Sequence, residues 1–256
     1  MNVFRSRRPL VVARRGSARE APENTFEAFD QAEADGADAL QLEVRLTADG
    51  EVVVSSEPEV VLGNQRVPIA SLCVPDLLRV RLAKGERSGS VPLLRDVLLR
   101  YRADGRYLVE LKPCPSPRPG LLEFRVAALL TQLGAVDRCV VVASAPEPIR
   151  RLLEAQPAFE TAWAFDGTVY RPEGRLWPSL PAGCRGIAPV LPLLSDRLFA
   201  EAKGEEIAVH VSPVNDPAEA LRLAQLGVTS LVTDDVPVLR AALDAAGLSR
   251  PNALAV

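Results

Sequence analysis

The sequence predicts an α/β protein, a single (β/α)8 TIM barrel with a short irregular insertion after an early β-hairpin. Two observations predict this fold. Short β-rich runs alternate with helical patterns along almost the whole chain, which is typical of parallel βα units. The length of 256 residues also matches the roughly 250 residues of one such barrel. Residues 1–256 are therefore expected to form one domain.

Nine runs have the composition of β-strands, which is one more than the barrel needs. The sequence Thr-Ala-Asp-Gly at 47–50 explains the extra run, because it is typical of a tight turn and joins the second and third runs as a hairpin. The predicted strands are Leu10–Ala13, Ala39–Leu46, Glu51–Ser55, Tyr107–Leu111, Cys139–Ala143, Thr161–Phe165, Gly186–Val190, Ile207–Val211 and Ser230–Thr233.

Helical patterns occupy the segments between most of these strands. Pro119–Leu133 places its apolar residues on one stripe, as a helix packed against a sheet does. The first helix is expected to begin at Asn24, which can act as its N-cap with Glu27 three residues later. The segment Pro58–Ser90 has no clear period, so it is interpreted as the irregular insertion before a helix at Val91–Arg102.

Composition excludes several classes of partner. The formal charge of -3 and the pI near 5.5 give no broad basic field, so nucleic acid is not expected as a partner. Charged residues or prolines interrupt every apolar run before it reaches the roughly 18 residues of a membrane span. The apolar run near the N-terminus is also too short for a signal peptide. A cytoplasmic location is therefore predicted.

Short motifs follow one another in a fixed order along the chain. They are Ala-Arg-Arg-Gly at 13–16, Pro-Glu-Asn-Thr at 22–25, Gly-Ala-Asp at 36–38, Gln-Leu-Glu-Val at 41–44, Leu-Thr-Ala-Asp-Gly at 46–50, Glu-Leu-Lys at 110–112 and Leu-Val-Thr-Asp at 231–234. In this order they resemble the glycerophosphodiester phosphodiesterase family, which has H-R-G, P-E-N-T, E-x-D and E-x-K. The resemblance covers nearly the whole chain. It implies a barrel with a divalent metal and a phosphodiester at the C-terminal ends of the strands.

The resemblance places two proton-transferring histidines of the family at positions that hold Arg14 and Ser56 here. A guanidinium does not give up its proton in proteins, and a serine hydroxyl is a weak nucleophile without a neighbouring base. Glu57 stands where the family has an aspartate. The candidate catalytic positions are therefore Arg14, Arg15, Ser56 and Glu57, with both histidine roles unfilled.

The resemblance also implies a metal site, which is altered in this chain. Gln41 and Glu43 replace the E-x-D pair of the family, while Glu110 matches its E-x-K glutamate. Gln41 thus removes one anionic ligand, and Glu43 has a longer side chain than the aspartate that it replaces. Mg²⁺ requires strict octahedral geometry and Ca²⁺ tolerates looser sites. We expect Gln41, Glu43 and Glu110 to bind Mg²⁺ or Ca²⁺ weakly, or to bind no metal.

The cationic residues of the site are more numerous than in the family. Arg15 and Lys112 match family residues, and Arg14 adds a further positive charge to the same region. Arginine binds phosphate oxygens bidentately, and lysine supplies a point charge. With Ser212, which follows the predicted strand Ile207–Val211, these three residues form the candidate binding site for a phosphate-bearing ligand.

One hypothesis explains the altered metal and cation sets together. Arg14 would pair with Glu43 or Glu110 and occupy the space of the missing metal, which would leave a site for an anion. The alternative is an internal ion-pair cluster without a ligand, since buried ion pairs need not be functional.

The chain contains one histidine, His210, on the predicted strand Ile207–Val211. It shares a face with Ser212 but lies two residues deeper, a distance of roughly 6.6 Å along a strand. A side chain at that depth more often fills the core of a barrel than acts at its opening. His210 is therefore expected to be a core residue rather than a relocated base.

The sequence is compatible with three functions. The first is a protein of lipid or phosphodiester metabolism that resembles the family but lacks ordinary diesterase activity, and binds a small phosphate-bearing molecule or a protein partner. The second is an active, metal-dependent phosphoric diester hydrolase with rearranged residues, in which Ser56, Glu57 or His210 transfers the proton. The third is an enzyme that expels a phosphate or diphosphate leaving group by electrostatic stabilisation.

Overall fold

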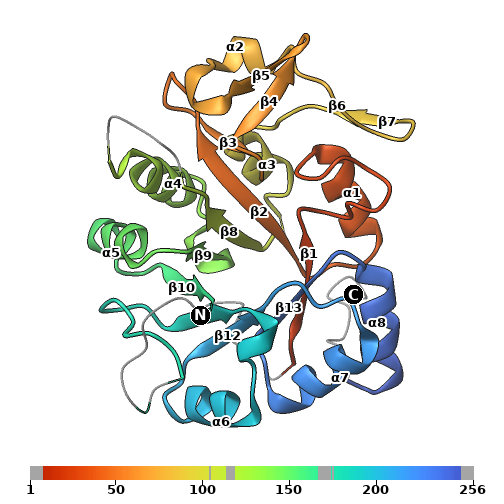
Figure 1. The fold of residues 1–256 in the computed structure, drawn as a ribbon, viewed down its shortest axis with the longest axis vertical. Coiled ribbons are helices and arrows are strands. Elements are labelled where there is room, and N and C mark those ends of the chain that lie inside the picture. The colour runs from red at the N-terminus through yellow and green to blue at the C-terminus, as the bar shows by residue number, and fades with distance from the viewer. Residues whose placement is uncertain (1–7, 104, 114–118, 167–173, 175, 249–256) are drawn as a thin grey trace.

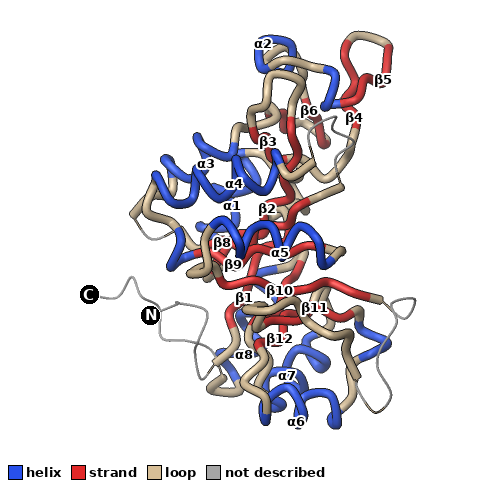
Figure 2. Tube along the Cα trace, turned by 90° about the vertical axis from the view of Figure 1, so that its left-hand side faces the viewer, coloured by secondary structure: helices blue, strands red, loops and turns tan. Residues whose placement is uncertain are grey.

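A computed structural model describes residues 8–103, 105–113, 119–166, 174 and 176–248 of the chain. One sheet contains nine strands, and eight of them are parallel and close into a barrel because β1 pairs with both β2 and β13. Helices surround the barrel, as Figures 1 and 2 show. The predicted (β/α)8 barrel is confirmed.

The barrel strands agree closely with the sequence-based prediction. They are β1 (Leu10–Arg14), β2 (Ala39–Leu46), β8 (Tyr107–Leu111), β9 (Cys139–Ala143), β10 (Glu160–Phe165), β11 (Gly186–Pro189), β12 (Ala208–Val211) and β13 (Ser230–Thr233). The ninth strand, β3 (Val52–Val54), pairs antiparallel with β2. The predicted hairpin after β2 is therefore confirmed.

The helices lie between successive strands. They are α1 (Phe26–Ala34), α2 (Val74–Leu77), α3 (Leu94–Arg100), α4 (Leu121–Gln132), α5 (Pro146–Ala155), α6 (Asp196–Gly204), α7 (Pro217–Leu226) and α8 (Val236–Ala245). Among the described residues, no helix is both long and apolar enough to span a bilayer.

The predicted start of the first helix is wrong by one residue. Asn24 has a left-handed backbone with φ of 56°, whereas an N-cap residue is normally extended. Thr25 is extended, with φ of -120° and ψ of 162°, and its side chain accepts a hydrogen bond from the Ala28 amide. Thr25 is therefore the cap, and Asn24 forms the turn before it.

The insertion between β3 and α3 is more regular than the sequence predicts. It contains two antiparallel hairpins, β4 (Glu59–Leu62) with β5 (Gln65–Pro68) and β6 (Leu82–Lys84) with β7 (Arg87–Gly89). Their strands are only three or four residues long, too short for a period to be recognised in the sequence. In Figure 1 the insertion lies at one end of the molecule, beyond β2 and β3.

Apolar residues form three buried clusters. The largest lies between the barrel and its helices, and a separate cluster packs around the insertion. The third fills the inside of the barrel and includes Leu10, Val12, Ala39 and Leu108. Because side chains alternate along a strand, residues two positions beyond this inner cluster face the same interior. The C-terminal ends of the barrel strands, which we call the barrel mouth, thus hold Arg14, two residues after Val12.

Candidate functional site

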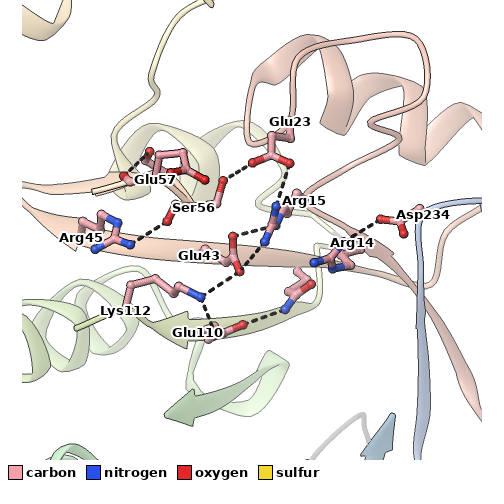
Figure 3. A network of polar contacts seen from close by, with 12 residues as sticks. Arg14, Arg15, Glu23, Glu43, Arg45, Ser56, Glu57, Glu110, Lys112 and Asp234 are labelled. Atoms are coloured by element: carbon pink, nitrogen blue, oxygen red, sulfur yellow. Dashed lines mark hydrogen bonds and ion pairs between the residues drawn. The ribbon is translucent and has the colours of Figure 1, made fainter. Parts of the chain in front are cut away.

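Strand register brings the candidate residues of β1, β2 and β8 together at the barrel mouth. Arg14 is the register partner of Gln41, and Glu43 is the register partner of Glu110. Partners in a parallel pair lie on the same face of the sheet, so these four side chains share the inner face. The expected convergence of the strand ends is confirmed, as Figure 3 shows.

A sharp turn directly after β1 sets the direction of Arg15. Both Arg15 and Gly16 have left-handed backbones, with φ of 58° and 83°. A Cβ atom on Gly16 would lie 2.7 Å from backbone atoms of Ala28, so no larger residue fits there without a shift of α1. The turn carries the Arg15 side chain to Glu43, where Nε lies 2.8 Å from Oε2 in an ion pair.

Glu43 and Glu110 are fully engaged with neighbouring nitrogen atoms. Glu43 Oε1 lies 3.2 Å from Lys112 Nζ and 3.3 Å from Arg15 Nη2. Glu110 Oε1 accepts a hydrogen bond from Lys112 Nζ at 3.0 Å, and its Oε2 accepts one from Gln41 Nε2 at 2.9 Å. Only 3% of the Glu43 side chain is exposed. Each of the four carboxylate oxygens therefore has a nitrogen partner.

The hypothesis that Arg14 pairs with Glu43 or Glu110 is wrong. Arg14 Nη1 instead lies 3.1 Å from Oδ1 of Asp234, which follows β13 (Figure 3). Arg15 and Lys112 neutralise the two glutamates in its place. The physical reason is the left-handed turn after β1, which directs Arg15 toward Glu43 and leaves Arg14 on the barrel strand beside β13.

Glu23 is a site residue that the sequence did not single out. Its Oε2 lies 2.8 Å from Arg15 Nη1, and its Oε1 accepts a hydrogen bond from the Ser56 hydroxyl. Arg45 supports Ser56 from the other side, because its Nη2 donates to the Ser56 carbonyl at 2.6 Å. Glu23 belongs to the Pro-Glu-Asn-Thr motif, so the motif itself was the signal that could have found it.

The other candidates lie around this network. Glu57 is exposed, and its carboxylate lies outside the contacts drawn in Figure 3. Ser212 is partly buried at the end of β12 and lines a cavity of about 380 Å³ in the barrel mouth, together with Gln41, Glu110 and His210. We call this space the mouth cavity. A second cleft, of about 500 Å³, lies between the β1–α1 loop and the insertion and is bordered by Ser56 and Glu57.

His210 is buried at the floor of the mouth cavity, as the sequence predicts for a core residue. It is 2% exposed, and its Nδ1 lies 2.8 Å from Ser230 Oγ. Burial lowers the pKa of His210 to about 4, because a charged imidazolium is poorly solvated there. The ring is therefore neutral at neutral pH.

The ion pairs fix the protonation states of the two network cations. Burial alone would lower the pKa of Lys112, but Glu110 and Glu43 outweigh it and raise that pKa above its ordinary value. Burial likewise opposes the charge on Arg15, yet Glu23 and Glu43 raise its pKa. Both side chains are thus held as cations and are poor proton donors.

Carboxylates oppose most of the cations of the site. Arg14, Arg15 and Lys112 form ion pairs with Glu23, Glu43, Glu110 and Asp234. Arg45 donates instead to the backbone carbonyls of Pro113 and Ser56. The mouth therefore holds an ion-pair network rather than a cluster of unopposed positive charge.

The donor set does not fit a hard divalent cation. Such an ion needs several oxygen ligands at about 2.1–2.5 Å, whereas the carboxylate oxygens of Glu43 and Glu110 already lie against Arg15, Lys112 and Gln41. Within the described ranges, no group of three or more His, Cys, Asp or Glu side chains is arranged to hold a metal ion. A cation could bind only by displacing the network's own nitrogen atoms.

The fold defines a TIM-barrel protein, and its candidate site residues lie at the C-terminal mouth. Residues 15–238 match the sequence profile of the glycerophosphoryl diester phosphodiesterase family. The chain belongs to this family. YhdW of Bacillus subtilis (strain 168), a protein named for the same phosphodiesterases, is 30% identical over 88% of this chain and 93% of its own length.

Solved structures show the same fold. A glycerophosphoryl diester phosphodiesterase-type protein from Silicibacter pomeroyi superimposes with a TM-score of 0.84 at 22% identity, covering 95% of each chain. A phosphodiesterase from Oleispira antarctica, solved in complex with the product sn-glycerol-3-phosphate, gives a TM-score of 0.78 at 19% identity, with 93% of this chain and 97% of that chain covered.

Proposed function

We propose that this member of the family binds a small phosphate-bearing molecule at the barrel mouth, with Arg14 as the main phosphate ligand, and does not hydrolyse phosphodiesters. The main support for this proposal is the ion-pair network, in which Arg15 pairs with Glu43 and Lys112 pairs with both Glu43 and Glu110. Hydrolysis requires groups that exchange protons near neutral pH. The cations and carboxylates at the mouth are instead held in their charged forms by their ion pairs, so they do not exchange protons readily near neutral pH.

None of the candidate residues is suited to transfer a proton near neutral pH. His210 is neutral and buried beneath the mouth cavity. Burial would raise the pKa of Glu23, but hydrogen bonds from Ser56 and Arg15 outweigh it and lower that pKa, so Glu23 is a poor base for the Ser56 hydroxyl. Glu57 is exposed and lies outside the network. None of these three residues is therefore suited to act as the general acid that protonates the leaving alcohol.

Arg14 has the geometry that a phosphate ligand requires. A single nitrogen, Nη1, contacts Asp234, and 28% of the side chain is exposed. The rest of its guanidinium fork makes no other hydrogen bond or ion pair with the described residues, so it can bind phosphate oxygens. The bound sn-glycerol-3-phosphate of the Oleispira antarctica relative supports a phosphate site in barrels of this fold.

The test is a calorimetric titration of the purified protein with inorganic phosphate. Arg14→Gln is expected to weaken binding at least about tenfold, because a charge-assisted bidentate contact is lost. Arg19→Gln is the matched control, since Arg19 also pairs with an aspartate, Asp235, but 65% of its side chain is exposed outside the network. Equal effects of the two variants, or no measurable phosphate binding, would refute the proposal.

Metal dependence is tested in the same titration. We propose that binding needs no divalent ion, so Mg²⁺, Ca²⁺ and a chelator are each expected to leave phosphate affinity unchanged within about twofold. Thermal unfolding with the same ions provides a second measurement, because an ion that binds the folded state raises Tm. A Tm increase that is lost in Glu110→Gln would show that the carboxylates do bind metal.

One contact favours the second candidate function, a diesterase with rearranged residues. The Ser56 hydroxyl donates to Glu23, which resembles a nucleophile beside its base. Under this alternative, the protein would release a phosphomonoester from glycerophosphocholine, and Ser56→Ala would abolish that release. Turnover that survives Ser56→Ala but is lost in Glu110→Gln would instead indicate a metal-dependent route.

A further inference from the structure

The mouth cavity has two walls of opposite character. Gln41 and Glu110, on β2 and β8, line one side of the cavity. Arg14 lies beside them on β1 as the register partner of Gln41. We call these ends of β1, β2 and β8 the charged wall. The opposite side is built from β9, β10 and β11 and presents Val142, Ala164 and Ala188. We call it the apolar wall.

The apolar surface continues across the cavity floor. Leu108 and Val232 line the cavity at the two ends of the apolar wall. Leu108, Val142 and Val232 are at most 3% exposed. Ala164 and Ala188 are only partly buried although they face the interior, because their small side chains leave the space in front of them open. A larger side chain at either position would therefore reduce the space of the cavity.

The polar groups that line the cavity stand at its floor, on the charged wall and at its rim. His210, at the floor, contacts Ser230, and the Gln41 amide donates to Glu110. Ser144, Asp166 and Ser212 stand at the rim, where Ser212 is partly buried and the other two are exposed. A polyol placed against Val142, Ala164 and Ala188 would lose hydrogen bonds to water, because none of these three side chains carries a polar atom, and that loss is unfavourable. An apolar group placed there would gain free energy from burial.

We propose that the phosphate ester bound by this chain carries an apolar organic group, aryl or alkyl, which lies against the apolar wall, and that glycerol phosphate is a poor ligand. The inference rests on the proposed function, because the phosphate of the same ligand contacts Arg14. It deepens that function by naming the class of ligand. The ligand is amphiphilic, with its charged end at β1 and its apolar end at β9–β11.

The experiment compares three probes by calorimetry: phenyl phosphate, sn-glycerol 3-phosphate and inorganic phosphate. Phenyl phosphate is expected to bind at least about tenfold more tightly than either other probe, through burial of its ring. Ala188→Leu fills the cavity and is expected to remove this advantage while inorganic phosphate binds as before. Ala128→Leu, at a partly buried alanine of α4 outside the cavity, is the matched control.

Two outcomes would overturn the inference. Glycerol 3-phosphate could bind as tightly as phenyl phosphate, or Ala188→Leu could fold and leave the preference for phenyl phosphate intact. Thermal unfolding identifies a variant that fails to fold, and Ala164→Leu then replaces it, because it fills the same space from β10. Loss of the preference in either filled variant, with the control unchanged, supports the inference.

Phenol, which carries no phosphate, separates this inference from the proposed function. Its binding is measured by the shift of its proton resonances on addition of protein. If inorganic phosphate does not bind but phenol binds and is lost in Ala188→Leu, the proposed function fails and the apolar site stands. If phosphate binding depends on Arg14 but phenol is unaffected by Ala188→Leu, the proposed function stands and the apolar site is refuted.

Discussion

The two walls of the mouth cavity occupy equivalent positions on one barrel and carry opposite chemistry. The charged wall, on β1, β2 and β8, holds side chains that neutralise one another through ion pairs. The apolar wall, on β9 to β11, holds valine and alanine at inward-facing positions. The backbone pattern is the same on both sides, so the difference lies in which residues occupy the last inward position of each strand.

Charged residues at a barrel mouth therefore do not by themselves indicate a catalytic site. Arg15 and Lys112 are cations at strand ends, yet their carboxylate partners are already in place. Arg14 forms an ion pair through one nitrogen, and it is the residue to which we assign phosphate binding. Substitutions in each wall in turn test this distinction.

The largest effect is expected on the charged wall, from Glu43→Ala. Removal of this buried carboxylate takes away the partner that Arg15 and Lys112 share. Arg15 keeps Glu23 and Lys112 keeps Glu110, so we expect a loss near the low end of the about 3–5 kcal/mol that breaking a buried pair costs. Urea unfolding measures the loss. Glu43→Gln, which keeps the size and a hydrogen-bond acceptor, is expected to lose less. A loss below about 1 kcal/mol in Glu43→Ala would show that the network does not stabilise the fold.

The second effect concerns His210, below the apolar wall. Its folded-state pKa is about 4 against an ordinary value of 6.5, so the unfolded chain binds a proton that the folded chain does not. The contribution is complete above pH 6.5 and is lost as the pH falls toward 4, by about 3 kcal/mol. Urea unfolding at several pH values is expected to show this slope, and His210→Gln is expected to reduce it. An unchanged slope in the variant would contradict the assignment.

The third effect comes from Leu108→Ala, which enlarges the mouth cavity from its floor. Leu108 is 3% exposed and borders the existing cavity, so a loss near the low end of the usual range, about 2 kcal/mol, is expected. Urea unfolding again provides the value. A loss above about 4 kcal/mol would indicate a tightly packed site with no cavity in front of Leu108.

The smallest effect is expected from Glu23, at the outer edge of the charged wall. Its pKa is lowered in the folded state, so its contribution is present above the unfolded pKa of about 4.3 and is lost as the pH falls below that value. Since 39% of the side chain is exposed, the contribution is expected to stay below about 1 kcal/mol. Glu23→Gln should flatten the acid limb of the stability curve, and a steeper limb in the variant would contradict the ion pair.

Most of the barrel could be predicted from the sequence, because its strands are nearly continuous apolar runs separated by turn residues. The nine predicted strands correspond to β1, β2, β3 and β8 to β13 within one or two residues. The hairpins of the insertion could not be predicted, since strands of three or four residues show no period. Asn24 was misassigned because Asn favours both helix caps and left-handed turns.

The residues that gather at the barrel mouth could be predicted from the sequence, but the ion pairs that they form with one another could not. The motifs correctly brought Arg14, Glu43 and Glu110 to one mouth. Which arginine meets Glu43 depends on the left-handed backbone of Arg15, and non-glycine residues adopt that conformation too rarely to be predicted from sequence. The same turn brings Glu23 to Arg15. The left-handed φ of Arg15 therefore explains why the observed ion pairs differ from the predicted ones.

The proposed function requires that the mouth binds phosphate esters and does not cleave them. A ³¹P NMR titration of the protein with methyl phenyl phosphate, followed over time with Mg²⁺, with Ca²⁺ and with a chelator, measures both properties at once. We expect the diester resonance to shift or broaden with protein, Arg14→Gln to remove this effect, and no phosphomonoester resonance to grow. A monoester resonance that grows with the wild-type protein and not with Glu110→Gln would contradict the proposed function.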